Sequence, residues 1–170
     1  MKKKHEFTPE QLRFFMQAAL QEARQALEEE EVPVGAVLVA SGQIIARGHN
    51  MSERLHDATA HAEMIALTAG SEYLGSKYLN DCTLFVTLEP CAMCAAASAW
   101  ARVGGLVFGA SDPKKGFRQL GGSALLHPKT RLTSGILAGE SQELLQAFFN
   151  SKRRDNGKPR PSKEEEDIAD

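Results

Sequence analysis

The chain has 170 residues, a length typical of one domain of about 100–200 residues. Its apolar fraction of 42% is high enough to build a buried core, and no apolar run reaches the roughly 18 residues of a membrane span. The formal net charge of −2 excludes a strongly basic nucleic-acid-binding protein. Residues 1–10 lack the apolar region of a signal peptide, so we expect no membrane association and a cytoplasmic location.

The first predicted helix starts at Thr8-Pro9-Glu10, which combines a cap residue, a proline in the first turn and an acid. Apolar residues then recur at helical spacing as far as Ala26. We expect Phe14 and Phe15 to belong to the core. Residues 28–31 are expected to end the helix as an acidic, solvated run.

Residues 32–46 predict a β-hairpin, because two apolar runs rich in β-branched residues flank the turn signal Ser41-Gly42. A polar loop over residues 52–59 follows. Thr59 is predicted to be the N-cap of a second helix, which we expect to stop at Gly75.

Residues 83–88 form a nearly continuous apolar strand, as expected for a strand covered on both faces. Pro90 is predicted to open the next helix. The small residues over 95–101 allow this helix to pack closely, and Trp100 belongs either to the core or to a subunit interface. Residues 105–109 predict another short strand.

The last third of the chain contains a predicted loop at 111–123, a weak strand at 131–137 and an amphipathic helix at 141–152. Residues 155–170 are almost entirely polar and charged, so they are predicted to be a disordered tail. The folded domain is expected to be residues 1–154. This order of elements predicts an α/β three-layer sandwich, with a central mixed five-stranded sheet and helices on both faces.

The chain has three cysteines, an odd and small number that argues against a disulfide framework. Cys82 opens an apolar strand and is expected to be a small buried residue. Cys91 and Cys94 have the Cys-x-x-Cys spacing, which in a reducing compartment indicates metal binding or redox activity. His61 and Glu63 add an imidazole and a carboxylate, and zinc prefers such nitrogen and sulfur ligands.

We therefore predict a zinc site formed by His61, Cys91 and Cys94. Three protein ligands leave the fourth tetrahedral position open, which is typical of a catalytic site. A water at that position becomes acidic near neutral pH, and the Glu63 carboxylate is a candidate to move its proton. Residues two apart on a helix point about 200° from one another, so we place the metal off the helix N-terminus, where His61 and Glu63 both reach it. Both cysteines are expected in the first turn of their helix, where the positive helix end favours thiolate.

His61-Ala62-Glu63 and Pro90-Cys91-Ala92-Met93-Cys94 together resemble the known signature of the zinc-dependent base deaminases, the cytidine and deoxycytidylate deaminase superfamily. Within it, the chain is most similar to the branch that deaminates adenosine in bacterial tRNA. The likeness covers residues 7–154. It includes further segments in the same order: Val34-Gly35-Ala36-Val37, Gly48-His49-Asn50, Val86-Thr87-Leu88-Glu89, Val107-Phe108-Gly109-Ala110 and Phe148-Phe149.

The resemblance implies that residues 1–154 are a zinc-dependent deaminase domain with one zinc ion per subunit. It implies that Glu63 shuttles a proton between water, the base and the departing amine. The implied reaction is hydrolytic deamination of adenosine to inosine at the wobble position of a tRNA anticodon stem-loop, whose unpaired nucleotide is splayed out into the pocket. It also implies a homodimer, with a cleft built by both subunits.

Six residues are predicted to contact the substrate: Asn50, Val34, Ala62, Leu88, Asp112 and Phe149. The Asn50 amide both donates and accepts hydrogen bonds, although an asparagine here also suits a turn. The backbone N–H of Ala62 is free at a helix start. Val34 and Leu88 are expected to wall the pocket.

The resemblance places Asp112 near the nucleic-acid backbone, although a plain loop aspartate is an equal alternative. It places Phe149 against the anticodon loop, whereas an apolar pair on an amphipathic helix is more often core. Basic residues at the two ends of the chain, Lys2–Lys4 and Lys152–Arg154 with Lys158 and Arg160, are candidates to bind phosphates or are solvated termini.

Two other functions stay open. A free nucleobase or nucleoside deaminase, of the guanine or cytosine type, would use the same zinc chemistry and suits the net charge better. A non-catalytic, zinc-stabilised RNA-binding module is the third possibility. Glu63 argues against the module, because a structural zinc site has no use for a free carboxylate.

Overall fold

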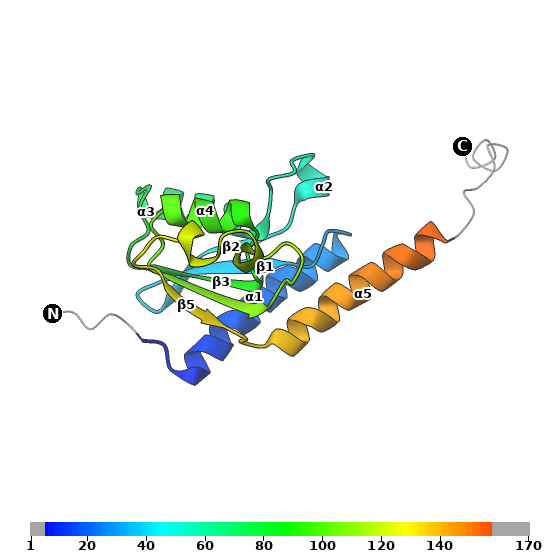
Figure 1. Cartoon of the computed structure of the whole chain (residues 1–170), viewed down its shortest axis with the longest axis horizontal. Helices are drawn as coiled ribbons and strands as arrows, with labels where there is room; N and C mark the ends of the chain where they lie inside the picture. Colours follow the sequence, from blue (N-terminus) through cyan, green and yellow to red (C-terminus); the bar gives the residue numbers. More distant parts are fainter. Residues whose placement is uncertain (1–5, 158–170) are drawn as a thin grey trace.

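A mixed sheet lies between two layers of helices in the computed structural model, which describes residues 6–157 (Figure 1). The predicted three-layer α/β sandwich is therefore confirmed. Asp155 and Asn156, which were assigned to the tail, are the last residues of a helix. The rest of the predicted tail, residues 158–170, lies outside the described residues.

Within residues 6–157 the sheet has five strands, in the order β2-β1-β3-β4-β5. Their bounds are Gly35–Ala40 for β1, Gln43–His49 for β2, Cys82–Leu88 for β3, Gly105–Ala110 for β4 and Arg131–Ser134 for β5. Strand β1 pairs antiparallel with β2 and β3, whereas β4 pairs parallel with β3 and β5. The predicted hairpin and the mixed character of the sheet are both confirmed.

Helices α1 (Pro9–Glu28) and α5 (Ala138–Asn156) cover one face of the sheet, and α3 (Ala62–Leu74) and α4 (Ala92–Trp100) cover the other (Figure 1). Successive residues of β1 serve the two layers, because side chains alternate across a strand. Leu38 packs in the core beneath α3, and Val37 packs against Phe15 of α1. No helix in the described residues is long and apolar enough to cross a bilayer.

Helix α1 begins as predicted, with Thr8 as N-cap and a reciprocal hydrogen-bonded pair between Thr8 and Gln11. Phe15 is buried, but the prediction for Phe14 is wrong, since its side chain is 62% exposed. Adjacent helical residues face different directions, so only one of the pair reaches the sheet. The solvated acidic run is also wrong at Glu31, which is 1% exposed.

The segment before α3 differs from its prediction. The polar loop contains the short helix α2 (Ser52–Leu55). Thr59 is not an N-cap, because its hydroxyl and its backbone N–H both donate to the Asp57 carboxylate. The N-cap is His61, two residues later, and Gly75 ends α3 in the left-handed conformation as predicted.

Helix α4 starts at Ala92, two residues later than expected, because Pro90 precedes the N-cap, Cys91. Trp100 is 84% exposed, so the core alternative for it is wrong. The predicted loop at 111–123 contains the 3-10 turn Phe117–Gln119 and the start of a second, Gly122–Leu125. Helix α5 extends past both predicted ends.

Candidate metal centre and active-site cleft

Two helix N-termini meet at the predicted metal site. His61 is the N-cap of α3 and Cys91 is the N-cap of α4, both with extended backbone, and Cys94 lies in the first turn of α4. Neither N-cap side chain makes the usual capping hydrogen bond. The three side chains instead turn toward one another. We predicted that the metal lies off the N-terminus of this helix. His61 is the N-cap of α3, so its side chain is where that prediction requires it.

The distances between the three donor atoms suit a tetrahedral metal ion. His61 Nδ1 lies 3.6 Å from Cys91 Sγ and 3.5 Å from Cys94 Sγ, and the three atoms lie within 4.8 Å of one another. Zinc–nitrogen bonds of about 2.0–2.1 Å and zinc–sulfur bonds of about 2.3 Å at a tetrahedral angle require a separation of roughly 3.6 Å. The residues present therefore fit zinc, both in donor type and in spacing.

Hydrogen bonds within the metal-free cluster set the protonation of its groups. The pKa of Cys91 is lowered to about 4, first by a hydrogen bond from the Cys94 thiol and then by one from His61. The pKa of Cys94 is raised, because its proton is held in that bond and its side chain is buried. The pKa of His61 is also raised, chiefly by its hydrogen bond to Cys91. The thiol of Cys91 is therefore the one shifted toward the thiolate form that binds metal, whereas zinc must displace the proton of Cys94.

Glu63 occupies the first turn of α3, one residue after Ala62, and is only 4% exposed. Burial raises the pKa of Glu63 from the usual 4.5 to about 7. A carboxyl group with a pKa near neutrality exchanges protons readily in both directions at pH 7. Glu63 is therefore suited to acid–base work.

A cavity of 1120 Å³ opens in front of the donor cluster. It is lined by every predicted site residue except Cys94, which is completely buried. The lining residues from the predicted set are Val34, Asn50, His61, Ala62, Glu63, Leu88, Cys91, Asp112 and Phe149. The structure thus brings together residues from six separate stretches of sequence, and their individual roles stay predictions.

Three of the residues predicted to bind substrate, Asn50, Asp112 and Phe149, already contact other protein groups, and each does so in a different way. Asn50 is 8% exposed and is already hydrogen-bonded to the protein at both ends of its amide. The Asp112 carboxylate accepts the backbone N–H groups of the two lysines that follow it, as in a loop-forming aspartate. Phe149 is 46% exposed and packs edge-to-face on buried Phe148, so the two phenylalanines divide the core and surface roles.

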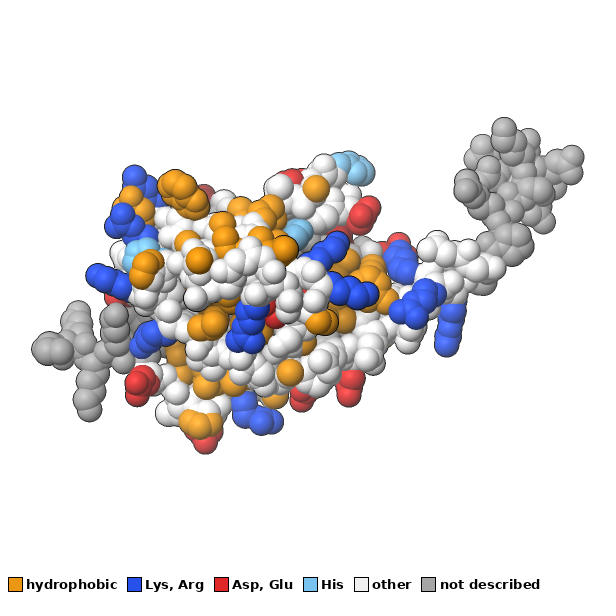
Figure 2. Space-filling model, in the orientation of Figure 1, with side chains coloured by type: hydrophobic (Ala, Val, Ile, Leu, Met, Phe, Trp, Pro, Cys, Tyr) orange, Lys and Arg blue, Asp and Glu red, His pale blue; other side chains and the backbone are white. Residues whose placement is uncertain are grey.

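The rim of the cleft is divided by charge. Lys114, Lys115, Lys152 and Arg153 line it from the loop after β4 and from α5, whereas Glu29, Glu30 and Glu53 line it, with Arg54, from the end of α1 and from α2. Lys and Arg side chains gather over the outer half of α5 (Figure 2). Of the basic ends proposed from sequence, only Lys152–Arg154 is among the described residues, and part of it reaches the cleft.

Three polar residues of this region were not singled out as site residues by the sequence. Glu89, 4% exposed, accepts the backbone N–H of Asp112 at 3.0 Å and that of Arg118 at 3.1 Å, and so fixes the loop after β4. Glu31 lies beside Asn50. An acid directly before Pro90, at the end of a buried strand, was the one available signal, and it pointed to Glu89.

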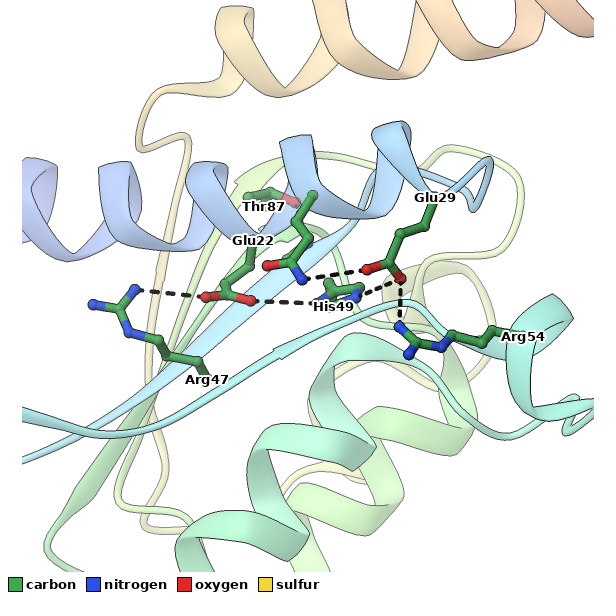
Figure 3. A network of polar contacts seen from close by, with 8 residues as sticks. Glu22, Glu29, Arg47, His49, Arg54 and Thr87 are labelled. Atoms are coloured by element: carbon green, nitrogen blue, oxygen red, sulfur yellow. Dashed lines mark hydrogen bonds and ion pairs between the residues drawn. The ribbon is translucent and has the colours of Figure 1, made fainter.

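His49 is the third, and it lies between two acids. Its ring nitrogens lie 3.3 Å from Glu22 and 3.1 Å from Glu29 (Figure 3). Arg47 Nη1 lies 3.6 Å from the other Glu22 oxygen, and Arg54 Nη1 lies 3.3 Å from the same Glu29 oxygen as His49. These contacts link the end of β2, directly before Asn50, to helix α1 and its C-cap, Glu29.

Comparison with known protein families gives one match over most of the fold. The family model described as the cytidine and deoxycytidylate deaminase zinc-binding region matches residues 9–110. This range contains both motifs of the donor cluster and Glu63.

Individual proteins resemble the chain over longer ranges. It is 46% identical to a tRNA-specific adenosine deaminase of Agrobacterium fabrum, over 84% of this chain and 96% of that protein. A structure from a study of A-to-I editing by tRNA:A34 deaminases at the wobble position of transfer RNA is 45% identical, with a TM-score of 0.73, over 78% of this chain and 99% of that one. A guanine deaminase from Bacillus subtilis is 34% identical, with a TM-score of 0.57, over 64% and 69%.

Proposed function

The chain belongs to the zinc-binding cytidine and deoxycytidylate deaminase family, and we propose that it converts adenosine to inosine at the wobble position of a tRNA anticodon loop. The reaction is hydrolytic: water adds at C6 of the base and the amino group leaves as ammonia. The observation that carries the proposal is the placement of buried Glu63 beside the donor atoms of His61, Cys91 and Cys94, at the cleft that Glu63, His61 and Cys91 line.

The donor cluster would hold zinc, one ion per subunit, with the remaining position facing the cleft. Bound zinc supplies Lewis-acid activation of a water. Glu63 then takes a proton from the attacking water, passes it to the ring nitrogen beside C6, and delivers a proton to the departing amine. The pKa of Glu63, raised to about 7, suits both the accepting and the donating steps.

The walls of the cleft would hold the base. The Ala62 N–H, free at the start of α3, and the Asn50 amide provide hydrogen bonds to its polar edge. Val34 and Leu88 cover its apolar faces. An unpaired loop nucleotide reaches such a pocket at little energetic cost, because it has no partner to leave.

The basic side of the rim would bind the flanking RNA. Lys152 and Arg153 line the cleft beside Phe149, so they can neutralise phosphates while the exposed ring stacks on a base. This local arrangement supplies what the net charge of −2 does not. Binding should weaken steeply with salt, because it depends on counterion release.

We further propose a homodimer. Tyr73, Leu74 and Trp100, at the ends of α3 and α4, are 69%, 43% and 84% exposed, and large apolar side chains in this number favour a protein partner. Sedimentation equilibrium at working concentration should give the mass of two chains. A monomer at all concentrations would contradict the dimer. The cytoplasmic location of the protein is a separate prediction, which this measurement does not address.

One experiment tests the reaction and its rivals. The protein is incubated with an anticodon stem-loop carrying a wobble adenosine and, separately, with guanine, adenosine and cytosine. Inosine formed only in the RNA supports the proposal, and a stem-loop with guanosine at the wobble position is the matched control. Conversion of a free base would support the alternative function, and absence of any product at full zinc content would support an RNA-binding module.

A further inference from the structure

We infer that Glu31 is a positioning residue that holds the Asn50 side-chain amide in one of its two orientations toward the substrate. The inference rests on the proposed function, because it concerns how the cleft presents Asn50 to the base. It adds a residue that the sequence placed in a solvated run.

The contacts of Glu31 are buried and specific. Asn50 Nδ2 donates to Glu31 Oε2 over 3.1 Å, and the two residues are 8% and 1% exposed. The other carboxylate oxygen of Glu31 accepts the backbone N–H of Arg54 at 2.8 Å. On its other side, Asn50 Oδ1 accepts the Ser52 hydroxyl at 3.1 Å.

These partners do not constrain the amide equally. An ionised carboxylate only accepts hydrogen bonds, whereas a hydroxyl both donates and accepts. Rotating the Asn50 amide by half a turn would place its oxygen against Glu31, and two acceptors would then face each other in a buried site. Ser52 would tolerate either orientation, so Glu31 decides which one is present.

The backbone around Asn50 is fixed as well. Its N–H donates to the Val34 carbonyl at 3.1 Å. The preceding residue, His49, is held between Glu22 and Glu29 (Figure 3). The position and the polarity of the amide are therefore both set before any substrate binds. A base that requires the opposite pattern of donor and acceptor meets a group that cannot turn to suit it.

Glu31→Gln tests the inference, because glutamine keeps the shape but replaces one acceptor oxygen with a donor. We expect kcat/KM for the wobble-adenosine stem-loop to fall roughly 10- to 100-fold, since hydrogen bonds to charged groups are among the stronger ones. In an Asn50→Ala background the same change should alter kcat/KM by less than about twofold, because the residue through which Glu31 acts is gone. An equal loss in both backgrounds would overturn the inference. Glu28→Gln, at the exposed last residue of α1, is the control.

A second measurement does not depend on turnover. The side-chain NH2 of Asn50 is assigned by NMR as the signal lost in Asn50→Ala. We expect its hydrogen exchange to be slow in the unmodified protein and in Glu28→Gln, and at least about tenfold faster in Glu31→Gln. Unchanged exchange would contradict the inference. If the unmodified protein deaminated no RNA, the proposed function would fail while this measurement still decided the role of Glu31.

A double variant with exchanged hydrogen-bonding groups tests the inference if Glu31→Gln alone does not fold. Combining Glu31→Gln with Asn50→Asp restores the hydrogen bond with donor and acceptor exchanged. We expect the pair to regain thermal stability but to stay at least about tenfold below the unmodified protein in kcat/KM, because the polarity shown to the base is reversed. A pair that regained full turnover, or one that did not fold, would overturn the inference.

Discussion

Two glutamates on the wall of the cleft, Glu63 and Glu89, are equally buried but have different partners. Each is 4% exposed. The Glu89 carboxylate accepts backbone N–H groups at both oxygens, from Asp112 and Arg118. Glu63 lies beside the thiols and the imidazole, and burial raises its pKa to about 7.

The difference shows that burial alone does not identify a catalytic carboxylate. When backbone donors occupy both oxygens, a buried glutamate serves to hold a loop. When hydrogen bonds and nearby charges do not fully compensate for the desolvation of a buried carboxylate, its pKa rises. The group then keeps its proton to higher pH and can transfer it. The comparison assigns structure to Glu89 and chemistry to Glu63, and the following variants test that division.

Removing a metal ligand should have the largest effect. Cys91→Ala deletes the side chain that supplies the thiolate, so we expect zinc content to fall far below one ion per chain and deaminase activity to fall to background. Elemental analysis of the purified protein measures the metal. Cys82→Ala, at a buried cysteine away from the cleft, should retain zinc. Full zinc in the Cys91 variant would refute the ligand assignment.

Glu63→Gln should separate chemistry from metal binding. We expect zinc to be retained and kcat on the stem-loop to fall about 10²- to 10⁴-fold, the usual contribution of a positioned proton-transfer group. Single-turnover kinetics would measure the loss. Glu72→Gln, exposed on the same helix, should be neutral. Activity within tenfold of the unmodified enzyme would remove Glu63 from the mechanism.

The same variant has a pH signature in chelator-treated protein. The folded-state pKa of Glu63 is raised, so the native state keeps a proton that the unfolded state loses between pH 4.5 and about 7. Stability from this group is therefore present below pH 4.5 and is lost as pH rises to about 7. Glu63→Gln should abolish this loss. Relative to its effect at pH 4, the substitution should therefore raise the free energy of unfolding at pH 8 by on the order of 3 kcal/mol, since each pKa unit corresponds to about 1.4 kcal/mol. Urea unfolding at the two pH values tests this, and an equal effect at both would argue against the raised pKa.

Glu89→Gln should be a stability variant with intact metal. One oxygen becomes an amino group that faces a backbone donor, so we expect a loss of about 1–3 kcal/mol in the free energy of unfolding. Urea denaturation measures it, and zinc content should not change. Glu143→Gln, exposed on α5, is the control. If Glu89→Gln instead kept full stability and lost turnover as Glu63→Gln does, the division between the two glutamates would be wrong.

The cluster of His61, Cys91 and Cys94 was largely predictable from sequence because its signals are local. His61 and Glu63 are two residues apart, Cys91 and Cys94 are three apart, and the chemistry of these side chains restricts the metal. The order of strands and helices then brought the two motifs together. The prediction of the N-cap at Thr59 was wrong, because its hydroxyl finds a nearer acceptor in Asp57.

The partners of buried acids could not be predicted in this way. Glu31 follows three other glutamates, and no local pattern distinguishes it from them. Its hydrogen-bond partners, the Asn50 side chain and the Arg54 backbone, lie beyond the β1–β2 hairpin in the sequence and contact Glu31 only in the folded structure. The Phe14–Phe15 pair gave the same kind of error, since periodicity identified an apolar stretch but not which ring met Phe85.

The two predicted zinc ligands at the starts of α3 and α4 occupy N-cap positions, where serine, threonine or aspartate side chains normally stabilise a helix by about 1 kcal/mol each. His61 and Cys91 provide no such anchoring. In the metal-free protein, α3 and α4 therefore lack the side-chain hydrogen bond that usually stabilises a helix N-terminus. Selection for robustness alone would favour serine at both places, and such a chain would become sturdier as it became inert.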